Sequence, residues 1–160
     1  MDRLKEQLKH LLDNLDGVGT WLAPLLLRLI LAKEFWDAGI EKLNGDNWFI
    51  DIQGQFPFPF NMLPPELSWN LATGFEIIGP IALLLGLGTR FFALSLSILT
   101  LVAISAVHAG HGYTISEGGW KLPLIYLVMF LPLILSGPGK VSIDHWLRQR
   151  FLKTQRRLWS

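Results

Sequence analysis

The sequence of 160 residues contains no cysteine. The protein therefore cannot carry out thiol–disulfide chemistry by itself, and it cannot hold an iron–sulfur cluster on thiolates. Charged residues are also nearly absent from three long stretches. Residues 69–88 contain only Glu76, residues 91–109 contain no Lys, Arg, Asp or Glu, and residues 120–136 contain only Lys121. Stretches of this kind are apolar enough to lie inside a lipid bilayer.

Hydrophobic residues are abundant in their place. They make up 51% of the chain, and the mean hydropathy is +0.37, which is high for a soluble domain and ordinary for a small multi-span membrane protein. A helix needs about 20 residues to cross a hydrocarbon core of about 30 Å. The sequence therefore predicts an all-α fold, a four-helix transmembrane bundle within residues 20–136. The expected spans cover residues about 20–43, 69–88, 90–109 and 119–136.

Each end of the chain is predicted to add an amphipathic helix that lies in the membrane interface. In residues 1–16, leucines recur at helical spacing, with charged residues on the other side. In residues 137–160, Trp and Phe side chains are interleaved with basic residues, a pattern that anionic lipid headgroups would hold. Binding of nucleic acid by this basic tail is not expected beside four membrane spans.

The distribution of charge predicts how the bundle is oriented. Residues 137–160 hold six Lys or Arg residues against the single Asp144, and the short 86–90 link ends in Arg90. The longer 44–68 link carries only acidic charges. By the positive-inside rule, both termini are expected in the cytoplasm, and the chain is expected to be a multi-pass protein of the bacterial inner membrane.

The first predicted span carries many charges for a helix in lipid. Each central charge costs roughly 2.5–3.5 kcal/mol on an insertion scale, so these side chains should not all face lipid. At about 100° per residue, several of them fall within one arc of roughly 100°. They are Lys33, Glu34, Asp37 and Glu41. Arg28 and Lys42 lie on the other side of the helix, nearer its two ends.

Helix rise places these charges near polar residues of the other spans. At about 1.5 Å per residue, Glu34 lies roughly 14 Å and Asp37 roughly 9 Å below the outer end of the first span. Glu76 lies roughly 10 Å down the second span, and His108 ends a face of small and hydroxyl side chains on the third. We therefore predict a polar pocket that opens outward beneath the aromatic 47–69 loop. Its candidate ligand or proton-transfer residues are Lys33, Glu34, Asp37, Glu41, Glu76 and His108.

A structural interpretation of the same charges stays open. Lys33 and Asp37 are four residues apart and could form an ion pair within the helix, and Lys42 could pair with Glu76 if its side chain reaches inward. Such a network would fix the helix register and do no chemistry. The functional interpretation rests on the excess of carboxylates over the one nearby cation, Lys33, because crowded carboxylates favour keeping a proton on one of them.

Two kinds of ligand fit the predicted pocket. A quinone suits an apolar cavity in which a carboxylate or a histidine contacts each carbonyl oxygen. A metal ion is the second kind, because His108 and His111 lie near Glu117 and the acidic residues. A haem held between histidines is less favoured, since His10 and His145 are predicted on the opposite side of the membrane from the other two.

Three segments of the chain form a recognisable series. They are Arg28 with FWDAGIEKL at 35–43, Glu76 with LLLGLGTRFFAL at 83–94, and SGPGKVSIDHWL at 136–147. In this order they resemble the DoxX family of small four-helix membrane proteins. The resemblance implies a membrane bundle and gives little chemistry, because no catalytic residue set is agreed across that family. Asp37 and Glu41 are acidic where many relatives have neutral residues. A functional site of those relatives therefore cannot be transferred to this chain.

A narrower resemblance involves PPEL at 64–67, HAGHGY at 108–113 and the segment at 118–140. These are similar to HvfX-like DoxX proteins, which accompany maturation proteins for copper-binding modified peptides. The resemblance implies an accessory protein with a membrane or cytoplasmic protein partner, serving a redox or metal-peptide maturation system, with copper as a ligand. Relatives linked to thiosulfate:quinone oxidoreductase imply the alternative, a quinone-interacting oxidoreductase subunit. Small residues in the third span leave a homo-oligomer open.

Overall fold

The computed structural model describes residues 2–158, which form helices joined by short links, with no β-strand in that range. Side chains are described from Arg3 to Leu152, so Trp159 and the side chains of the last three basic residues of the predicted tail lie outside the described part. The long helices are α1 (Asp2–Asn44), α3 (Pro65–Leu85), α4 (Thr89–Ala103), α5 (Lys121–Leu135) and α6 (Ile143–Leu158). The shorter elements are α2 (Phe49–Ile52), the 3₁₀ turns η1 (Gln53–Gln55) and η2 (Phe60–Met62), the π-helical turn η3 (Ile104–His108) and the 3₁₀ turn η4 (Ala109–His111).

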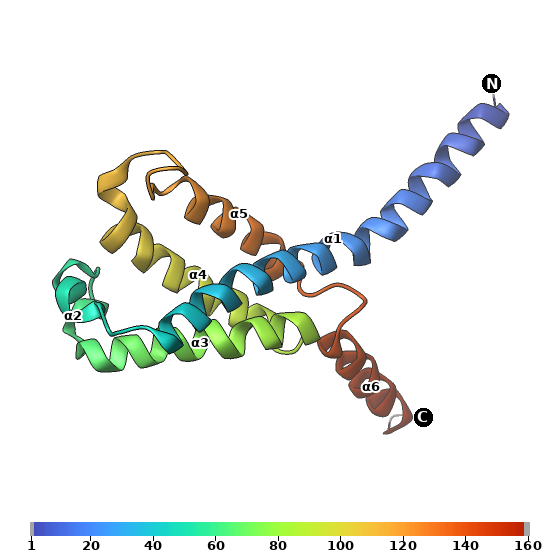
Figure 1. The fold of residues 1–160 in the computed structure, drawn as a ribbon. Coiled ribbons are helices and arrows are strands. Elements are labelled where there is room, and N and C mark those ends of the chain that lie inside the picture. Colours follow the sequence, from blue (N-terminus) through green and yellow to red (C-terminus); the bar gives the residue numbers. More distant parts are fainter. Residues whose placement is uncertain (1, 159–160) are drawn as a thin grey trace.

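Helices α1, α3, α4 and α5 form one bundle (Figure 1). Helix α1 packs along α3 and α4 packs along α5, while contacts between α3 and α4 and between α1 and α5 complete the bundle. The core draws fully buried apolar side chains from each of these helices. They are Leu31, Leu83, Leu96, Phe130 and Leu133. Helix α6 leaves the bundle at one end and carries the chain away from it (Figure 1).

The helices have the length and composition of membrane spans. Within residues 2–158, three are long and apolar enough to cross a bilayer: the helix from Arg3 to Asn44, α3, and α4 with its extension to His111. Helix α5 is an apolar helix of 15 residues, roughly 22 Å long, that packs against both α4 and α1. The prediction of an all-α transmembrane bundle is confirmed, and the chain is a membrane protein. The predicted domain boundaries stay predictions.

The first helix differs from its expected division into two parts. An interfacial helix over residues 1–16 and a separate span were predicted, whereas α1 is one continuous helix of 43 residues, roughly 64 Å long. Gly17 and Gly19 lie inside α1 without ending it, because a helical glycine costs only about 1 kcal/mol relative to alanine. The N-terminal half of α1 projects from the bundle (Figure 1). Its leucine side chains are exposed. Its place in the membrane interface therefore stays a prediction.

The bundle has two ends of different composition. The aromatic end holds α2 and the Phe-rich 48–63 loop, while the basic end holds the 86–88 turn and the 136–148 segment. Arg28 ties the basic end together, and its side chain is only 2% exposed. The guanidinium donates hydrogen bonds of 2.7–3.1 Å to the backbone carbonyls of Leu83, Leu84, Pro138 and Val141. One side chain of α1 thus holds the last turn of α3 against the segment that follows α5.

Asp144 makes the complementary contacts at the basic end. Its carboxylate accepts hydrogen bonds from the backbone N–H groups of Gly88 at 2.8 Å and Thr89 at 2.9 Å, which caps the start of α4. Gly86 has a left-handed backbone with φ of 65°, and a Cβ at this position would collide with Ser142. Arg28, the 83–94 segment and the 136–147 segment of the DoxX-like pattern therefore meet at this end, where several of their residues hold helix ends.

Candidate functional site

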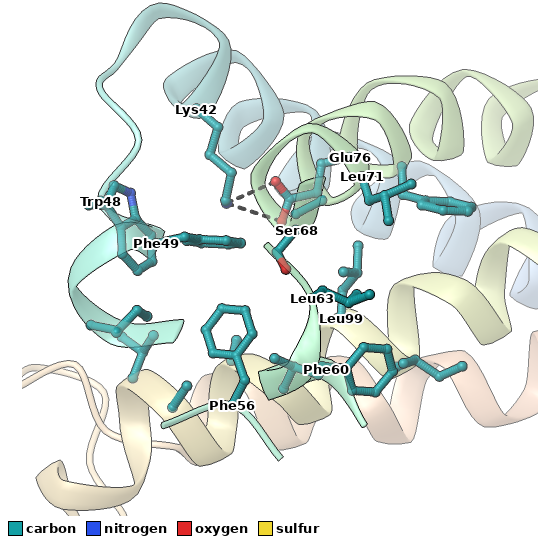
Figure 2. Close-up of a pocket in the computed structure, with 18 of the residues that line it drawn as sticks. Lys42, Trp48, Phe49, Phe56, Phe60, Leu63, Ser68, Leu71, Glu76 and Leu99 are labelled. Carbon is teal, nitrogen blue, oxygen red and sulfur yellow. Dashed lines mark hydrogen bonds and ion pairs between the residues drawn. The ribbon is translucent and has the colours of Figure 1, made fainter. Parts of the chain in front are cut away.

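A cavity of about 290 Å³ lies at the aromatic end, between α3 and α4 and beneath the 48–63 loop (Figure 2). Most of its lining is aromatic or aliphatic. These side chains include Trp48, Phe49, Ile52, Phe56, Phe60 and Leu63 from the loop, Leu71, Ala72 and Phe75 from α3, and Ile98, Leu99, Val102 and Ala103 from α4. The polar side chains of the lining are Ser68, Ser95, Lys42 and Glu76. The cavity is thus largely apolar, whereas the sequence predicts a polar pocket beneath the aromatic loop.

The loop covers the cavity because buried contacts fix it to α3. The side-chain amide of Gln53 donates hydrogen bonds to the carbonyl of Phe60 at 2.7 Å and to the Ser68 hydroxyl at 3.0 Å. The Phe49 ring packs edge-to-face against Trp69 of α3, with centroids 5.1 Å apart. These contacts set the rings of the loop against the cavity, and Figure 2 shows Phe49, Phe56 and Phe60 around its open space.

Lys42 and Glu76 supply the charged part of the cavity wall. The Lys42 Nζ atom lies 2.8 Å from Glu76 Oε2 and donates a hydrogen bond of 3.1 Å to Oε1 (Figure 2). Both side chains are largely buried, at 15% and 10% exposure. Each charge of a buried pair has lost its contact with water and depends on its partner. The Lys42 side chain is therefore directed across the gap between α1 and α3, toward Glu76.

Gly39 allows the two helices to approach closely beside this pair. A Cβ at position 39 would lie 2.7 Å from the Glu76 carbonyl oxygen and 2.9 Å from the end of the Ile77 side chain, both too close for any larger residue. Gly39 and Lys42 are three residues apart on α1, so they lie on the same face of the helix. The close contact at Gly39 therefore brings the Lys42 side chain within reach of the Glu76 carboxylate.

The other charges of the predicted site are divided among different partners. Lys33 and Asp37 form an ion pair within α1, and their side chains are 68% and 59% exposed. The Tyr126 hydroxyl of α5 donates a hydrogen bond to Glu34, and Glu41 is exposed. None of these three carboxylates lines the aromatic cavity. Both ion pairs of the structural interpretation are present, and Glu76 is the one predicted carboxylate in the cavity wall.

The two candidate metal-binding histidines do not line the cavity either. The Nδ1 atom of His108 lies 2.5 Å from the carbonyl of Gly118, and that of His111 lies 3.2 Å from the carbonyl of Val107. Among the side chains that the structure describes, no three His, Asp or Glu residues gather in positions that could hold a metal ion. The metal site predicted at His108 and His111 therefore stays a prediction, with no third ligand from the described residues.

Two parts of the cavity wall were not expected from the sequence, Lys42 as a lining residue and one apolar face of α4. Ser97 and Thr100 were expected in the pocket, but their hydroxyls donate to carbonyls of their own helix, at Ala93 and Leu96. The cavity is lined instead by the neighbouring face. Its members are Ser95, Ile98, Leu99, Val102 and Ala106. Their spacing of three and four residues is a helical signal, and it could have been found beside the polar one.

Comparison with known proteins identifies the family of this chain. The sequence pattern of the DoxX family matches residues 23–109, more than half of the chain. An uncharacterized protein of Haemophilus influenzae is 48% identical over 136 residues, which cover 85% of this chain and 90% of the relative. A second uncharacterized protein of that organism is 40% identical over 74 residues, 44% of this chain and 54% of the relative. No solved structure matches the chain. The protein therefore belongs to the DoxX family.

Proposed function

We propose that this protein is an accessory protein of the bacterial inner membrane that holds a quinone in its aromatic cavity and thereby supports a membrane-associated redox system. The composition of the cavity wall carries this proposal. Phenyl rings and aliphatic side chains surround a space of about 290 Å³, and Lys42 with Glu76 adds one charged pair. Small-molecule sites typically have such a wall, apolar with a few convergent polar groups.

The size and position of the cavity favour a ring-shaped, lipid-soluble ligand. Its volume is at the lower end of the range of about 300–1,000 Å³ for small-molecule pockets, which suits a headgroup and leaves a long apolar tail outside. Leu71 of α3 and Ile98 of α4 line the cavity and are also partly exposed on the outer surface of the bundle. The tail would therefore leave between these two helices, toward lipid.

Lys42 would orient the ligand. Its ammonium group has three N–H donors, and the contacts to Glu76 leave donor capacity for a quinone carbonyl oxygen. Glu76 would hold the ammonium group at the cavity wall. Ionisable residues at membrane depth are costly and often mark ligand or proton paths, which supports a working role for this pair. When bound, the quinone supplies redox chemistry that a partner enzyme would use.

The partner system is proposed from the narrower resemblance. The PPEL segment opens α3 and the HAGHGY segment ends the third span, so both belong to the aromatic end of the bundle. Their similarity to HvfX-like proteins favours a role beside the maturation of copper-binding modified peptides, with copper bound by the partner proteins. A thiosulfate:quinone oxidoreductase-like complex is the alternative. The genes that neighbour this one would distinguish the two systems.

Quinone binding is tested with the purified full-length protein in lipid nanodiscs. Trp48 lines the cavity, so titration with short-chain ubiquinone should quench its fluorescence in a saturable manner. Ala103→Phe places a ring in the cavity and should weaken binding at least tenfold. Leu101→Phe is the matched control, because Leu101 lies on the same helix, is exposed and does not line the cavity. It should bind as the wild type does.

Two results would count against the proposal. One is the absence of saturable quenching together with the absence of quinone in solvent extracts of the protein purified from native membranes. The other is equal binding by the Ala103→Phe and Leu101→Phe variants, which would place the ligand elsewhere on the protein. The first result would show that the protein does not bind quinone. The second would show that quinone does not bind in this cavity.

A further inference from the structure

A second cavity, of about 520 Å³, lies at the basic end of the bundle. It is built from four parts of the chain that are distant in sequence. Its lining includes Thr20 from α1, Arg90 and Phe91 from α4, Lys140 after α5, and Asp144 and Arg148 from α6. None of these residues belongs to the aromatic cavity, so the two sites are independent.

The charge of this cavity is strongly basic. Arg90, Lys140 and Arg148 contribute three positive charges, and His145 lies beside them. Asp144 is the acidic residue in the lining, and both of its carboxylate oxygens already accept hydrogen bonds from the start of α4, at Gly88 and Thr89. The carboxylate is thus held in a helix-capping position. The lining of the cavity has a net positive charge, because three basic side chains outnumber this one carboxylate.

Arg90 is positioned to bind an anion at the cavity wall. One terminal nitrogen of its guanidinium donates a 3.1 Å hydrogen bond to the carbonyl of Leu135, and a Cβ added at Gly137 would lie 3.6–3.9 Å from the guanidinium. This hydrogen bond directs the side chain along the end of α5 and uses one of its five N–H donors. A planar, fixed guanidinium is well suited to two hydrogen bonds with one phosphate group.

Exposed apolar side chains border the basic cavity on the side of the spans. Phe91 lines the cavity and is itself exposed, and Leu135 and Leu94 are exposed nearby on α5 and α4. The surface therefore changes from basic to apolar over the first turns of α4 and the last turn of α5. A basic surface next to an apolar one fits an amphiphile that has an anionic headgroup and acyl chains. A free anion would contact the basic side chains only and would not use the apolar border.

We propose that this cavity binds the phosphate headgroup of an anionic phospholipid of the phosphatidylglycerol class. Arg90 and Arg148 contact the phosphate group, Lys140 adds long-range attraction, and the acyl chains lie along Phe91 and Leu135. Basic pockets between membrane helices on the cytoplasmic side are known to take such headgroups. The lipid would contact the start of α4, the segment after α5 and the start of α6 at the same time. This inference does not depend on quinone binding.

The test uses the full-length protein in dodecyl maltoside, titrated separately with phosphatidylglycerol, phosphatidylcholine and inorganic phosphate. Retention of lipid is read by native mass spectrometry, and binding by the shift in melting temperature. Phosphatidylglycerol should bind in a saturable manner, phosphatidylcholine should bind much more weakly, and millimolar inorganic phosphate should not displace the lipid. Arg90→Gln with Arg148→Gln should weaken phosphatidylglycerol binding about 30-fold, as expected from two lost charge contacts.

The matched control is Arg3→Gln with Lys5→Gln, which removes two positive charges from the exposed N-terminal half of α1. It should bind phosphatidylglycerol as the wild type does. Arg148→Gln alone is the second variant, because its side chain is exposed and it tests the site even if the Arg90 change disturbs folding. The proposal is overturned by equal weakening in the control, by equal binding of phosphatidylcholine, or by displacement with inorganic phosphate, which would indicate a free-anion site.

Discussion

Lys42 of α1 and Glu76 of α3 form a largely buried ion pair between two helices, with Lys42 Nζ 2.8 Å from Glu76 Oε2. Removal of one partner leaves a buried charge without compensation, which typically costs about 3–5 kcal/mol. We therefore expect Lys42→Met to lower the melting temperature of the protein in detergent strongly. Lys42→Met combined with Glu76→Met should recover most of the loss, because two apolar side chains then replace the pair. A double variant as unstable as the single one would contradict this account.

The same double variant separates a structural role of the pair from a binding role. A pair that only fixes the two helices would be dispensable for quinone binding once its apolar replacement is folded. We expect the folded double variant to bind short-chain ubiquinone at least tenfold more weakly than the wild type, because the N–H donor is lost. Tryptophan quenching in nanodiscs measures this change. Unaltered affinity would show that Lys42 does not contact the ligand.

Two glycines of the bundle should respond to alanine in opposite directions. A methyl group at Gly39 would lie 2.7 Å from the Glu76 carbonyl oxygen, whereas one at Gly74 of α3 would meet nothing within 4 Å. We expect Gly39→Ala to destabilise the protein by about 1–3 kcal/mol through overpacking. Gly74→Ala should stabilise it by about 0.5–1 kcal/mol, because alanine favours the helix. Thermal unfolding of both variants in one detergent tests the signs, and a stabilising Gly39→Ala would refute the close contact.

Arg28 should be far less tolerant of lysine than Arg90 is. The Arg28 guanidinium donates to four backbone carbonyls, and a single ammonium group cannot reach all of them in that geometry. Arg28→Lys should therefore cost about 3 kcal/mol or more, since hydrogen bonds to charged groups contribute about 1.5–3 kcal/mol each. Arg90 is exposed and makes one such bond, so Arg90→Lys should remain close to the wild type in melting temperature. Similar losses in both variants would argue against the buried role of Arg28.

The predicted orientation can be measured with single engineered cysteines, because the chain has none of its own. Ser116 and Gln149 are exposed at opposite ends of the bundle. With both termini in the cytoplasm, a membrane-impermeant maleimide should label Ser116→Cys in spheroplasts with an intact inner membrane. Gln149→Cys should react only after lysis. The reverse pattern would invert the topology and contradict the positive-inside assignment.

The helices of this fold could be predicted because their signals are local. Apolar stretches of sufficient length mark the spans, and Gly86 with φ of 65° ends α3 as expected for a glycine after a helix. The continuity of α1 could not be predicted with the same ease. Gly17 and Gly19 weaken a helix without breaking it, so the sequence alone does not decide between one long helix and two shorter ones.

The candidate site could be predicted only in part, because it depends on how one helix is rotated against another. Helical phase places Lys33, Glu34 and Asp37 on one arc of α1, but it does not say which face meets α3. The face that meets α3 contains Gly39 and Lys42, since only a glycine fits against the Glu76 backbone. Helix rise places Glu76 level with Asp37, while the structural interpretation pairs Glu76 with Lys42, and Lys42 is the partner observed.

The contrast between the two ends of the bundle has a mechanical consequence. The basic end is joined by hydrogen bonds from Arg28 and Asp144 to backbone groups, which have fixed lengths and directions. The aromatic end is closed over its cavity by ring contacts of Phe49 together with two hydrogen bonds from Gln53. More backbone carbonyls and N–H groups are tied by side chains at the basic end than at the aromatic end, so we expect the aromatic end to be the one that adjusts when a ligand enters.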